Sequence, residues 1–125
     1  MSTLTVSNVS DGTLSIPTTY VTNGSAKAWV NFDGTGTIAA RDSLNLSSLT
    51  DRGTGQYTTT FTNSFAATGY CVHFSGGDVT YISSAAVYYL GTQATSNQQL
   101  NTYNFSTGSS QDMPTCCAQM HGDLA

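Results

Sequence analysis

The strongest constraint on the fold of this chain is a one-for-one alternation of apolar and polar residues in short segments. From Ala26 to Phe32, one face carries Ala26, Ala28, Val30 and Phe32, and the other carries Lys27, Trp29 and Asn31. Successive side chains of a β-strand point to opposite sides of its sheet, so this period of two predicts a strand with one face in a core. The pattern recurs in residues 56–62, 70–74 and 116–121.

Turn-forming residues separate these segments. Asp11-Gly12, Asn23-Gly24 and Asp33-Gly34 reach positive φ at low cost and are typical of tight hairpin turns. Roughly seven to nine short strands at this spacing predict an all-β fold, an antiparallel β-sandwich of jelly-roll type. We assign this single globular unit to residues 26–125.

Two segments fit the strand pattern less well. Residues 1–25 alternate weakly and contain Pro17, which sits only at a sheet edge or in a bend. We expect them to form an N-terminal arm or edge strands that pair with a neighbouring subunit. The stretch from Thr92 to Asn101 is polar, and we expect a long loop or a single helical turn there.

The composition excludes several classes of protein. Thr and Ser are the most frequent residue types, Glu is absent, and charged residues make up only 8% of the chain, with a net charge of −4. Binding to a nucleic-acid backbone needs many Lys and Arg side chains, so we expect no nucleic-acid partner. No apolar run is long enough for a membrane span. Residues 1–6 lack the basic and apolar regions of a signal peptide, so we expect synthesis and folding in a cytoplasm.

The acidic residues do not favour catalysis. Acid–base hydrolysis uses paired carboxylates with different pKa values, and without Glu the available pairs are Asp33 with Asp42 or Asp51. Each Asp lies in or beside a turn signal, where its side chain caps the backbone. There is also no Gly-x-Ser-x-Gly nucleophile motif and no phosphate-binding loop before a helix. We therefore predict a protein that is not an enzyme and has no cofactor.

Cysteine and histidine offer one weak metal hypothesis. The alternation places Cys71 with His73 on one strand face, and Cys117 with His121 on another. If those strands were neighbours in register, the four side chains would form a Cys₂His₂ zinc set. Their spacings are not those of zinc ribbons, so we predict no metal. The simpler interpretation makes Cys71, Cys116 and Cys117 small, partly buried apolar side chains in a reducing compartment.

Trp29 is the main candidate for recognition. One interpretation covers both faces of its strand, because the strand is central in a sandwich or lies at a subunit contact. The other makes Trp29 an exposed aromatic platform for a sugar ring or a partner protein. Tyr88 and Tyr89 point to opposite faces of their segment, so one of them is expected at the surface. The candidate binding residues are Trp29, Asn31, Tyr88, Tyr89, Gln93 and Asn97.

The middle of the chain carries an ordered block of motifs. Residues 27–37 read KAWVNFDGTGT, residues 41–51 read RDSLNLSSLTD, and residues 53–61 read GTGQYTTTF. This block, within a match over residues 26–75, resembles a β module of tail-fibre and virion-surface proteins of marine and other bacteriophages. The family pattern has Asn where this chain has Asp33 and Arg52, and the Cys116-Cys117 pair is a further departure.

The resemblance implies a structural protein exposed on a phage particle and assembled in the host bacterial cytoplasm. The implied partners are capsid or tail subunits and further copies of the chain, for example in a trimer. One role is a fibre-type or receptor-recognition module that binds a host surface glycan or receptor through residues 33–37, 51–56 and 92–101. The alternative is a capsid or tail decoration or cement protein with a purely structural role.

Overall fold

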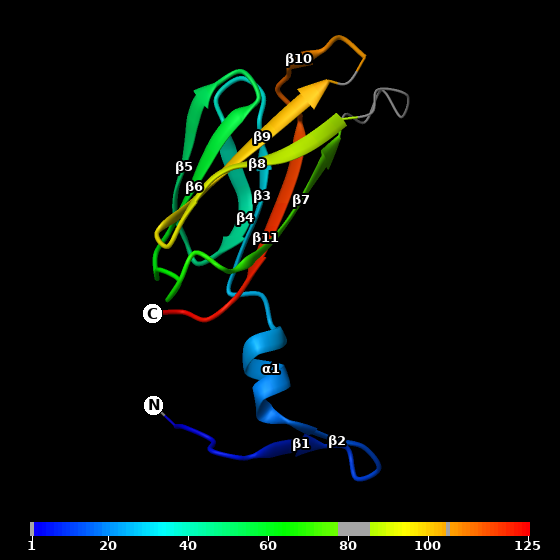
Figure 1. Ribbon diagram of the computed structural model, residues 1–125, viewed down its shortest axis with the longest axis vertical. Helices are drawn as coiled ribbons and strands as arrows, with labels where there is room; N and C mark the ends of the chain where they lie inside the picture. The colour runs from blue at the N-terminus through cyan, green and yellow to red at the C-terminus, as the bar shows by residue number, and fades with distance from the viewer. Residues whose placement is uncertain (1, 78–85, 105) are drawn as a thin grey trace.

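The computed structural model describes residues 2–77, 86–104 and 106–125, and it describes only the backbone of residues 86–90. It shows two packed antiparallel sheets with a smaller N-terminal extension (Figure 1). The all-β sandwich predicted from the alternation is confirmed. Among the described residues, no helix is both long and apolar enough to cross a membrane.

One sheet of the sandwich has four strands, and we call it the first sheet. Its strands, in spatial order, are β4 (Ala39–Leu44), β3 (Ala28–Asp33), β11 (Thr115–His121) and β7 (Cys71–Gly77). β11 therefore lies between β3 and β7, although both precede it by a long stretch of chain. These two pairings join the end of the chain to its middle.

The second sheet packs against the first. β6 (Gln56–Phe61) pairs with β5 (Leu46–Gly53) on one edge and with β9 (Asn97–Asn104) on the other. β9 also pairs with β8 (Ala86–Ala94) and with the short β10 (Ser109–Ser110). All these pairings are antiparallel, as the sequence pattern predicts.

Alternation along the strands explains where the core lies. In β3 the residues Ala28, Val30 and Phe32 are buried, whereas those between them are only partly buried. β6 and β11 repeat this pattern, with Tyr57, Thr59 and Phe61 buried in the first and Cys116, Ala118 and Met120 in the second. The predicted alternation of the two faces in these three strands is thus confirmed.

Aromatic rings hold the two sheets together. Phe32 of the first sheet meets Tyr57 of the second edge to face, with ring centroids 5.0 Å apart. At the other end of β6, Phe61 packs edge-on against Phe65, and Phe65 stacks on Tyr70 at 4.2 Å. Such contacts bring about 0.5–1.5 kcal/mol each beyond the burial of their area.

The prediction for Thr92 to Asn101 was wrong. These residues form the end of β8, a tight turn and most of β9, where Gln98, Asn101, Thr102 and Asn104 are buried although polar. The segment is a strand because its polar groups find partners: Thr59 Oγ1, for example, donates to Gln98 O at 3.1 Å. Hydrogen bonds therefore replace the apolar contacts that a strand prediction relies on.

Residues 2–25 lie outside the sandwich, and we call them the arm. They form the hairpin of β1 (Asn8–Ser10) and β2 (Ser15–Pro17), followed by helix α1 (Thr18–Gly24). The arm projects from one end of the sandwich (Figure 1). The helix was not predicted, and Asn23-Gly24 ends it instead of making a hairpin turn. The amine of Lys27 hydrogen-bonds Thr22 O and Ser25 O, which satisfies carbonyls at the helix end.

The arm and the sandwich should respond differently to loss of an apolar side chain. Phe32 is fully buried, so Phe32→Ala is expected to lower the free energy of unfolding by about 3–5 kcal/mol. Leu14 in the arm is 72% exposed, so Leu14→Ala is expected to change it by less than about 0.5 kcal/mol. Urea unfolding of both variants measures the difference, and equal effects would contradict this division of the molecule.

Two turn glycines offer a matched comparison. Gly36 and Gly55 have φ of 59° and 64°, so alanine costs about 1–2 kcal/mol at either position. At Gly36 an added Cβ meets nothing within 4 Å, whereas at Gly55 it would lie 2.5 Å from Thr102 O. Gly55→Ala is therefore expected to destabilise the protein more than Gly36→Ala, as measured by thermal unfolding. Equal melting temperatures would refute the close approach at Gly55.

Candidate functional site

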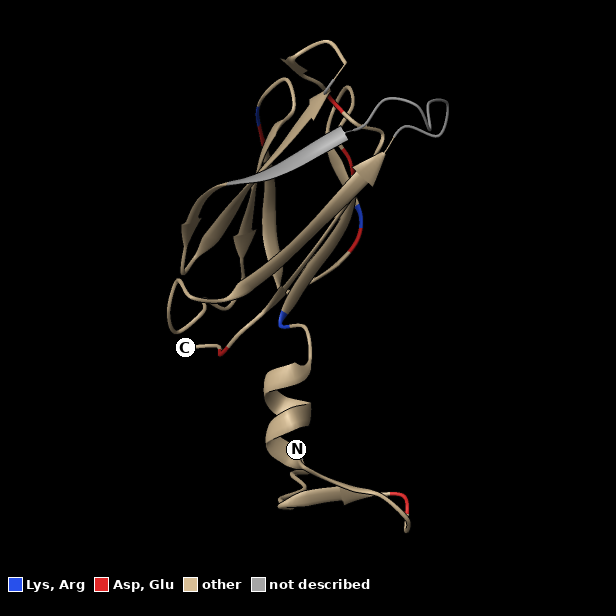
Figure 2. Ribbon diagram, turned by 45° about the vertical axis from the view of Figure 1, so that its right-hand side comes forward, with Lys and Arg blue, Asp and Glu red and all other residues tan. Residues whose placement is uncertain are grey.

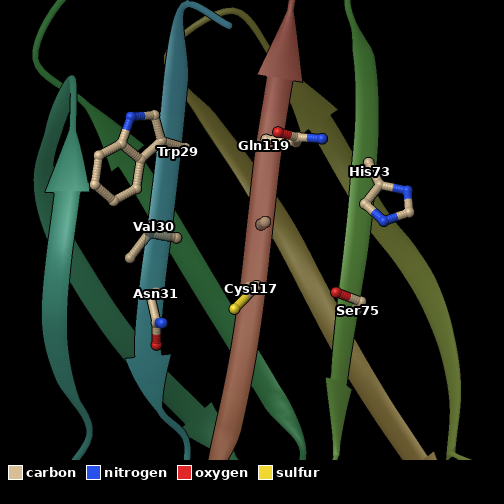
Figure 3. A pocket seen from close by; sticks show the side chains of 8 residues that line it. Trp29, Val30, Asn31, His73, Ser75, Cys117 and Gln119 are labelled. Atoms are coloured by element: carbon tan, nitrogen blue, oxygen red, sulfur yellow. The ribbon is translucent and has the colours of Figure 1, made fainter.

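The outer face of the first sheet carries a surface hollow. It has a volume of about 390 Å³ and is lined by Trp29, Val30, Asn31, His73, Ser75, Cys117, Ala118 and Gln119. We call it the groove. Figure 3 shows its side chains on β3, β11 and β7. A volume above about 300 Å³ is in the range of small-ligand sites.

Strand register arranges the groove in two rows. Gln119 of β11 is paired with Trp29 of β3 on one side and with His73 of β7 on the other. Two residues along, Cys117 is paired in the same way with Asn31 and Ser75. Side chains of directly paired residues on one face lie about 5 Å apart. The six side chains therefore form a compact two-by-three array.

Trp29 combines features of both interpretations given above. Its strand is central, and the opposite face of that strand is in the core. Its own side chain is partly buried on the outer face and lines the groove. The indole therefore presents a surface to solvent while its neighbours in the sheet restrict its motion.

Several polar groups of the groove have no partner. Within the part of the chain that the structure describes, no hydrogen bond involves the side chains of His73, Ser75 or Gln119. Asn31 Oδ1 accepts from Arg41 Nη1 at 3.3 Å, which orients its amide. The groove thus offers donors and acceptors that water or a ligand can satisfy.

None of the described residues that line the groove is Lys, Arg, Asp or Glu. Figure 2 shows the charged residues in short coloured segments, with long stretches of strand free of them. The electrostatic character of the site therefore comes from amides, a hydroxyl, an imidazole and a thiol. Such groups suit a neutral polar ligand better than a charged one.

Two of the other predicted binding residues, Gln93 and Asn97, do not join Trp29 and Asn31. Gln93 Nε2 donates to Tyr70 O at 2.7 Å, so this amide holds the β8–β9 hairpin against the loop before β7. Asn97 lies in the same hairpin, in the second sheet, with Nδ2 3.3 Å from Ser96 Oγ. The side chains of Tyr88 and Tyr89 lie outside the described residues.

The three predicted binding loops do not form one surface. Residues 33–37 and 51–56 meet at one end of the sandwich, where Gly34 N donates to Met113 O and Gly55 N donates to Asp112 Oδ1. The turn of the 92–101 hairpin lies at the opposite end of β6, where Phe61 N donates to Ser96 O. The 92–101 turn and the other two loops therefore lie at opposite ends of the sandwich, which the sequence alone does not predict.

The end near residues 33–37 contains a dense hydrogen-bond network. Arg41 donates to Asp33 Oδ2 at 3.0 Å, to Phe32 O at 2.9 Å and to Pro114 O at 2.6 Å. The Thr35 hydroxyl and amide, with Arg41, hold the pKa of Asp33 below its usual value. This stabilisation is present above the unfolded pKa and is lost as pH falls through the folded one. The network locks the β3–β4 turn to the chain before β11.

Two buried tyrosines act as structural donors. The Tyr57 hydroxyl lies 3.0 Å from Gly34 O and 3.1 Å from Asp112 Oδ1, and burial raises its pKa. Burial also raises the pKa of Tyr70 to about 12, and its hydroxyl lies 2.9 Å from Ala94 O. Both stay protonated at neutral pH, so both bind neighbouring oxygens instead of acting as bases.

The Asp carboxylates accept hydrogen bonds from the backbone. Those of Asp11, Asp33, Asp51 and Asp112 each accept a hydrogen bond from a backbone N–H in or beside a turn. This confirms for these four residues the capping role that the sequence predicts. The same bonds hold the carboxylates at separate turns instead of pairing them in a cleft. For Asp42 the prediction was wrong, because Asp42 lies inside β4 and its carboxylate accepts from Ser43 N of the same strand.

The weak zinc set is brought onto one sheet face but is not assembled. β7 and β11 are indeed neighbours, with Cys71 paired to His121, yet His73 faces Gln119 and Cys117 faces Ser75. His121 Nδ1 lies 3.1 Å from Gly24 O, at the end of α1. Among residues 2–77, 86–104 and 106–125, no three His, Cys, Asp or Glu side chains are close enough to bind a metal.

The lining residues Gln119 and Ser75 were not predicted as part of any site, and Cys117 and His73 were named only in the weak zinc set. The alternation already places Cys117 and Gln119 on an outer face and His73 on another. What it does not contain is the pairing of β11 with both β3 and β7, which depends on long-range contacts. Comparison of the chain with protein-family models, with curated proteins and with solved structures gave no match.

The three thiols should differ in reactivity. Cys71 is exposed, which corrects the expectation of partial burial, whereas Cys117 is partly buried and Cys116 is buried. Burial raises the pKa of the Cys116 thiol to about 12, so it remains in its unreactive protonated form. With an aromatic disulfide reagent at pH 8, we expect Cys71 to react first and Cys116 only after unfolding.

Serine variants assign the phases of this reaction. Cys71→Ser should remove the first phase, and Cys116→Ser should leave it intact. Reaction of Cys116 in the folded protein at the rate of Cys71 would contradict the burial described here.

Proposed function

We propose that this chain is a non-enzymatic bacteriophage virion protein exposed on the particle, a fibre-type or receptor-recognition module. The sandwich presents the groove, and the arm joins the module to other virion subunits. The resemblance of residues 26–75 to phage tail-fibre and virion-surface modules supports the location. One observation supports assigning recognition to the sandwich and attachment to the arm. The sandwich has its own core, whereas the arm has none.

The arm buries nothing of its own. The residues of β1, β2 and α1 are all exposed, except Thr18, which is partly buried. Seven large apolar side chains of the arm are each at least 43% exposed: Leu4, Val6, Val9, Leu14, Ile16, Tyr20 and Val21. A two-stranded hairpin is marginal in water by itself, so packing on another surface must hold this conformation.

The sandwich shows the opposite distribution. Its only strongly exposed large apolar side chains among the described residues are Leu44 and Leu124. A hydroxyl-rich surface with few charges stays in solution without a covering partner. This contrast supports a module that is fixed to the particle by one end and exposed at the other.

The partners proposed for the arm are capsid or tail subunits and further copies of the chain. A homo-oligomer such as a trimer brings several arms together, so that their apolar faces cover one another. Assembly of this kind takes place in the host bacterial cytoplasm, and the finished protein is located in the virion. The ligand proposed for the exposed end is a host surface glycan or receptor.

A decoration or cement protein is the alternative, and one observation favours it. β4 is an edge strand of the first sheet, and most of its residues are exposed on both faces. An open edge of this kind can add a strand from a neighbouring capsid or tail subunit. In that role the arm and β4 would both serve assembly.

The position of the chain on the virus that encodes it tests the proposal. Antibody labelling and quantitative mass spectrometry of purified particles give its location and copy number. A few copies at a fibre end support the recognition module, and hundreds on the capsid lattice support the cement protein instead. Absence from the particle would refute a virion role.

The arm should control self-association. Val9 and Ile16 face each other across the hairpin and are 48% and 47% exposed, so the double change Val9→Ser with Ile16→Ser removes apolar area from the proposed contact. We expect the full-length protein to be oligomeric by mass photometry and this variant to be monomeric, with an unchanged melting temperature of the sandwich.

Leu44→Ser is the matched control, because Leu44 is 48% exposed but lies in the sandwich. It should leave the oligomer intact. A wild-type protein that is monomeric at micromolar concentration would rule out self-association through the arm.

A further inference from the structure

We infer that the groove on the outer face of the first sheet binds a neutral saccharide, with one sugar ring stacked on Trp29. The inference deepens the recognition role in the proposed function and rests on it for biological meaning. Its physical basis is the groove alone: one aromatic plane, a set of unpartnered polar side chains, and no charge.

The aromatic plane sets the first requirement on the ligand. A pyranose ring has an apolar face of C–H groups and a rim of hydroxyls, so it needs an aromatic plane beside hydrogen-bonding groups. Trp29 supplies the plane on β3, and Gln119 lies directly across the strand pair on β11. Figure 3 shows the indole on the side of β3 away from β11, Gln119 on the central strand β11 with its amide toward β7, and His73 on β7.

The polar groups set the second requirement. Gln119 offers a donor and an acceptor, Asn31 offers its Nδ2 donor while its Oδ1 accepts from Arg41, and Ser75 offers a hydroxyl that both donates and accepts. His73 adds a ring nitrogen at the far side of the same row. A sugar hydroxyl likewise donates and accepts, so a ring lying over this array can pair with several of these groups at once.

The absence of charged lining residues sets the third requirement on the ligand. None of the eight lining residues is Lys, Arg, Asp or Glu. Arg41 reaches the lining residue Asn31, but its guanidinium is already bound to Asp33 Oδ2, Phe32 O and Pro114 O. Asp42 is paired with Asn31 across β3 and β4. Sialic acids, uronic acids and sulfated sugars would therefore lose water from an anionic group without gaining a free cationic partner. The groove therefore favours neutral hexoses and N-acetylhexosamines over acidic sugars.

The same observations disfavour a protein surface as the occupant. Stable protein interfaces have an apolar, well-packed centre. Among the described residues, the large exposed apolar side chains are concentrated in the arm, and only Leu44, paired with Trp29 across β3 and β4, adds one beside the groove. A small polar ligand fits this face better than a second polypeptide.

The sequence contains one Trp beside seven Tyr, so tryptophan fluorescence, excited at the long-wavelength edge where tyrosine does not absorb, reports on this site alone. The full-length chain is titrated with linear neutral hexasaccharides of glucose, linked β-1,4, α-1,4 or β-1,3, and with chitohexaose. We expect a saturable shift in Trp29 emission with at least one of them, at dissociation constants between about 10 μM and 10 mM. Sialyllactose and trigalacturonic acid serve as acidic probes and should give a weaker response.

Variants connect the signal to the groove. Gln119→Ala and His73→Ala keep the indole, and each is expected to weaken binding about three- to tenfold. Gln56→Ala is the matched control, since Gln56 is a partly buried strand residue of the second sheet, and it should bind as the wild type does. Trp29→Ala, followed by calorimetry, should lose binding at least tenfold, and circular dichroism of each variant establishes that it is folded.

Three results would overturn the inference. They are no emission change with any neutral probe up to about 10 mM, tighter binding of the acidic probes, and a response unchanged by Gln119→Ala and His73→Ala. Because the titration uses the isolated chain, its failure leaves the virion role untouched. Conversely, absence from the particle with normal sugar binding would refute the proposed function and leave the groove assignment standing.

Discussion

The pairing of β11 with β3 on one edge and with β7 on the other is the interaction on which the rest of the structure depends. It joins residues 28–33 and 71–77 to a strand near the end of the chain. The inner side of this trio supplies Phe32, Cys116 and Met120 to the core. The outer side supplies both rows of the groove. A shift of one residue in this register would exchange the two faces, so core burial also fixes the geometry of the site.

The sequence predicts this arrangement up to the point where strands must be paired. Alternation identifies the inward residues of β3, β6 and β11, because a period of two is a local property of the chain. It fails for β9, where Gln98 and Thr102 are fully buried. The Tyr70 hydroxyl donates to Gln98 Oε1 and the Thr102 hydroxyl donates to Gln111 O, and no local pattern contains these pairings. The same limit separates Trp29, which was predicted, from Gln119, which was not.

Hydrogen bonding lets a chain with so few charges and so many amides and hydroxyls form a tight core. Among the described residues, no buried side-chain nitrogen or oxygen lacks a partner. Asn45, at a φ of 57° between the two sheets, shows how this is achieved: its Oδ1 accepts from Asn63 N at 2.7 Å and its Nδ2 donates to Asn63 O at 3.0 Å. One amide thereby completes backbone pairing at a corner. A sandwich built in this way can leave its outer polar groups unpaired without loss of stability.

Scarcity of charge has a consequence for how the protein withstands digestion. Lys and Arg together number three in the chain, and Arg41 and Arg52 lie within β4 and β5. Lys27 lies at the junction, between the end of α1 and the start of β3. A protease that cuts after basic residues therefore meets its one site outside regular secondary structure at the boundary between arm and sandwich. A single cut there separates the sandwich, residues 28–125, from the arm.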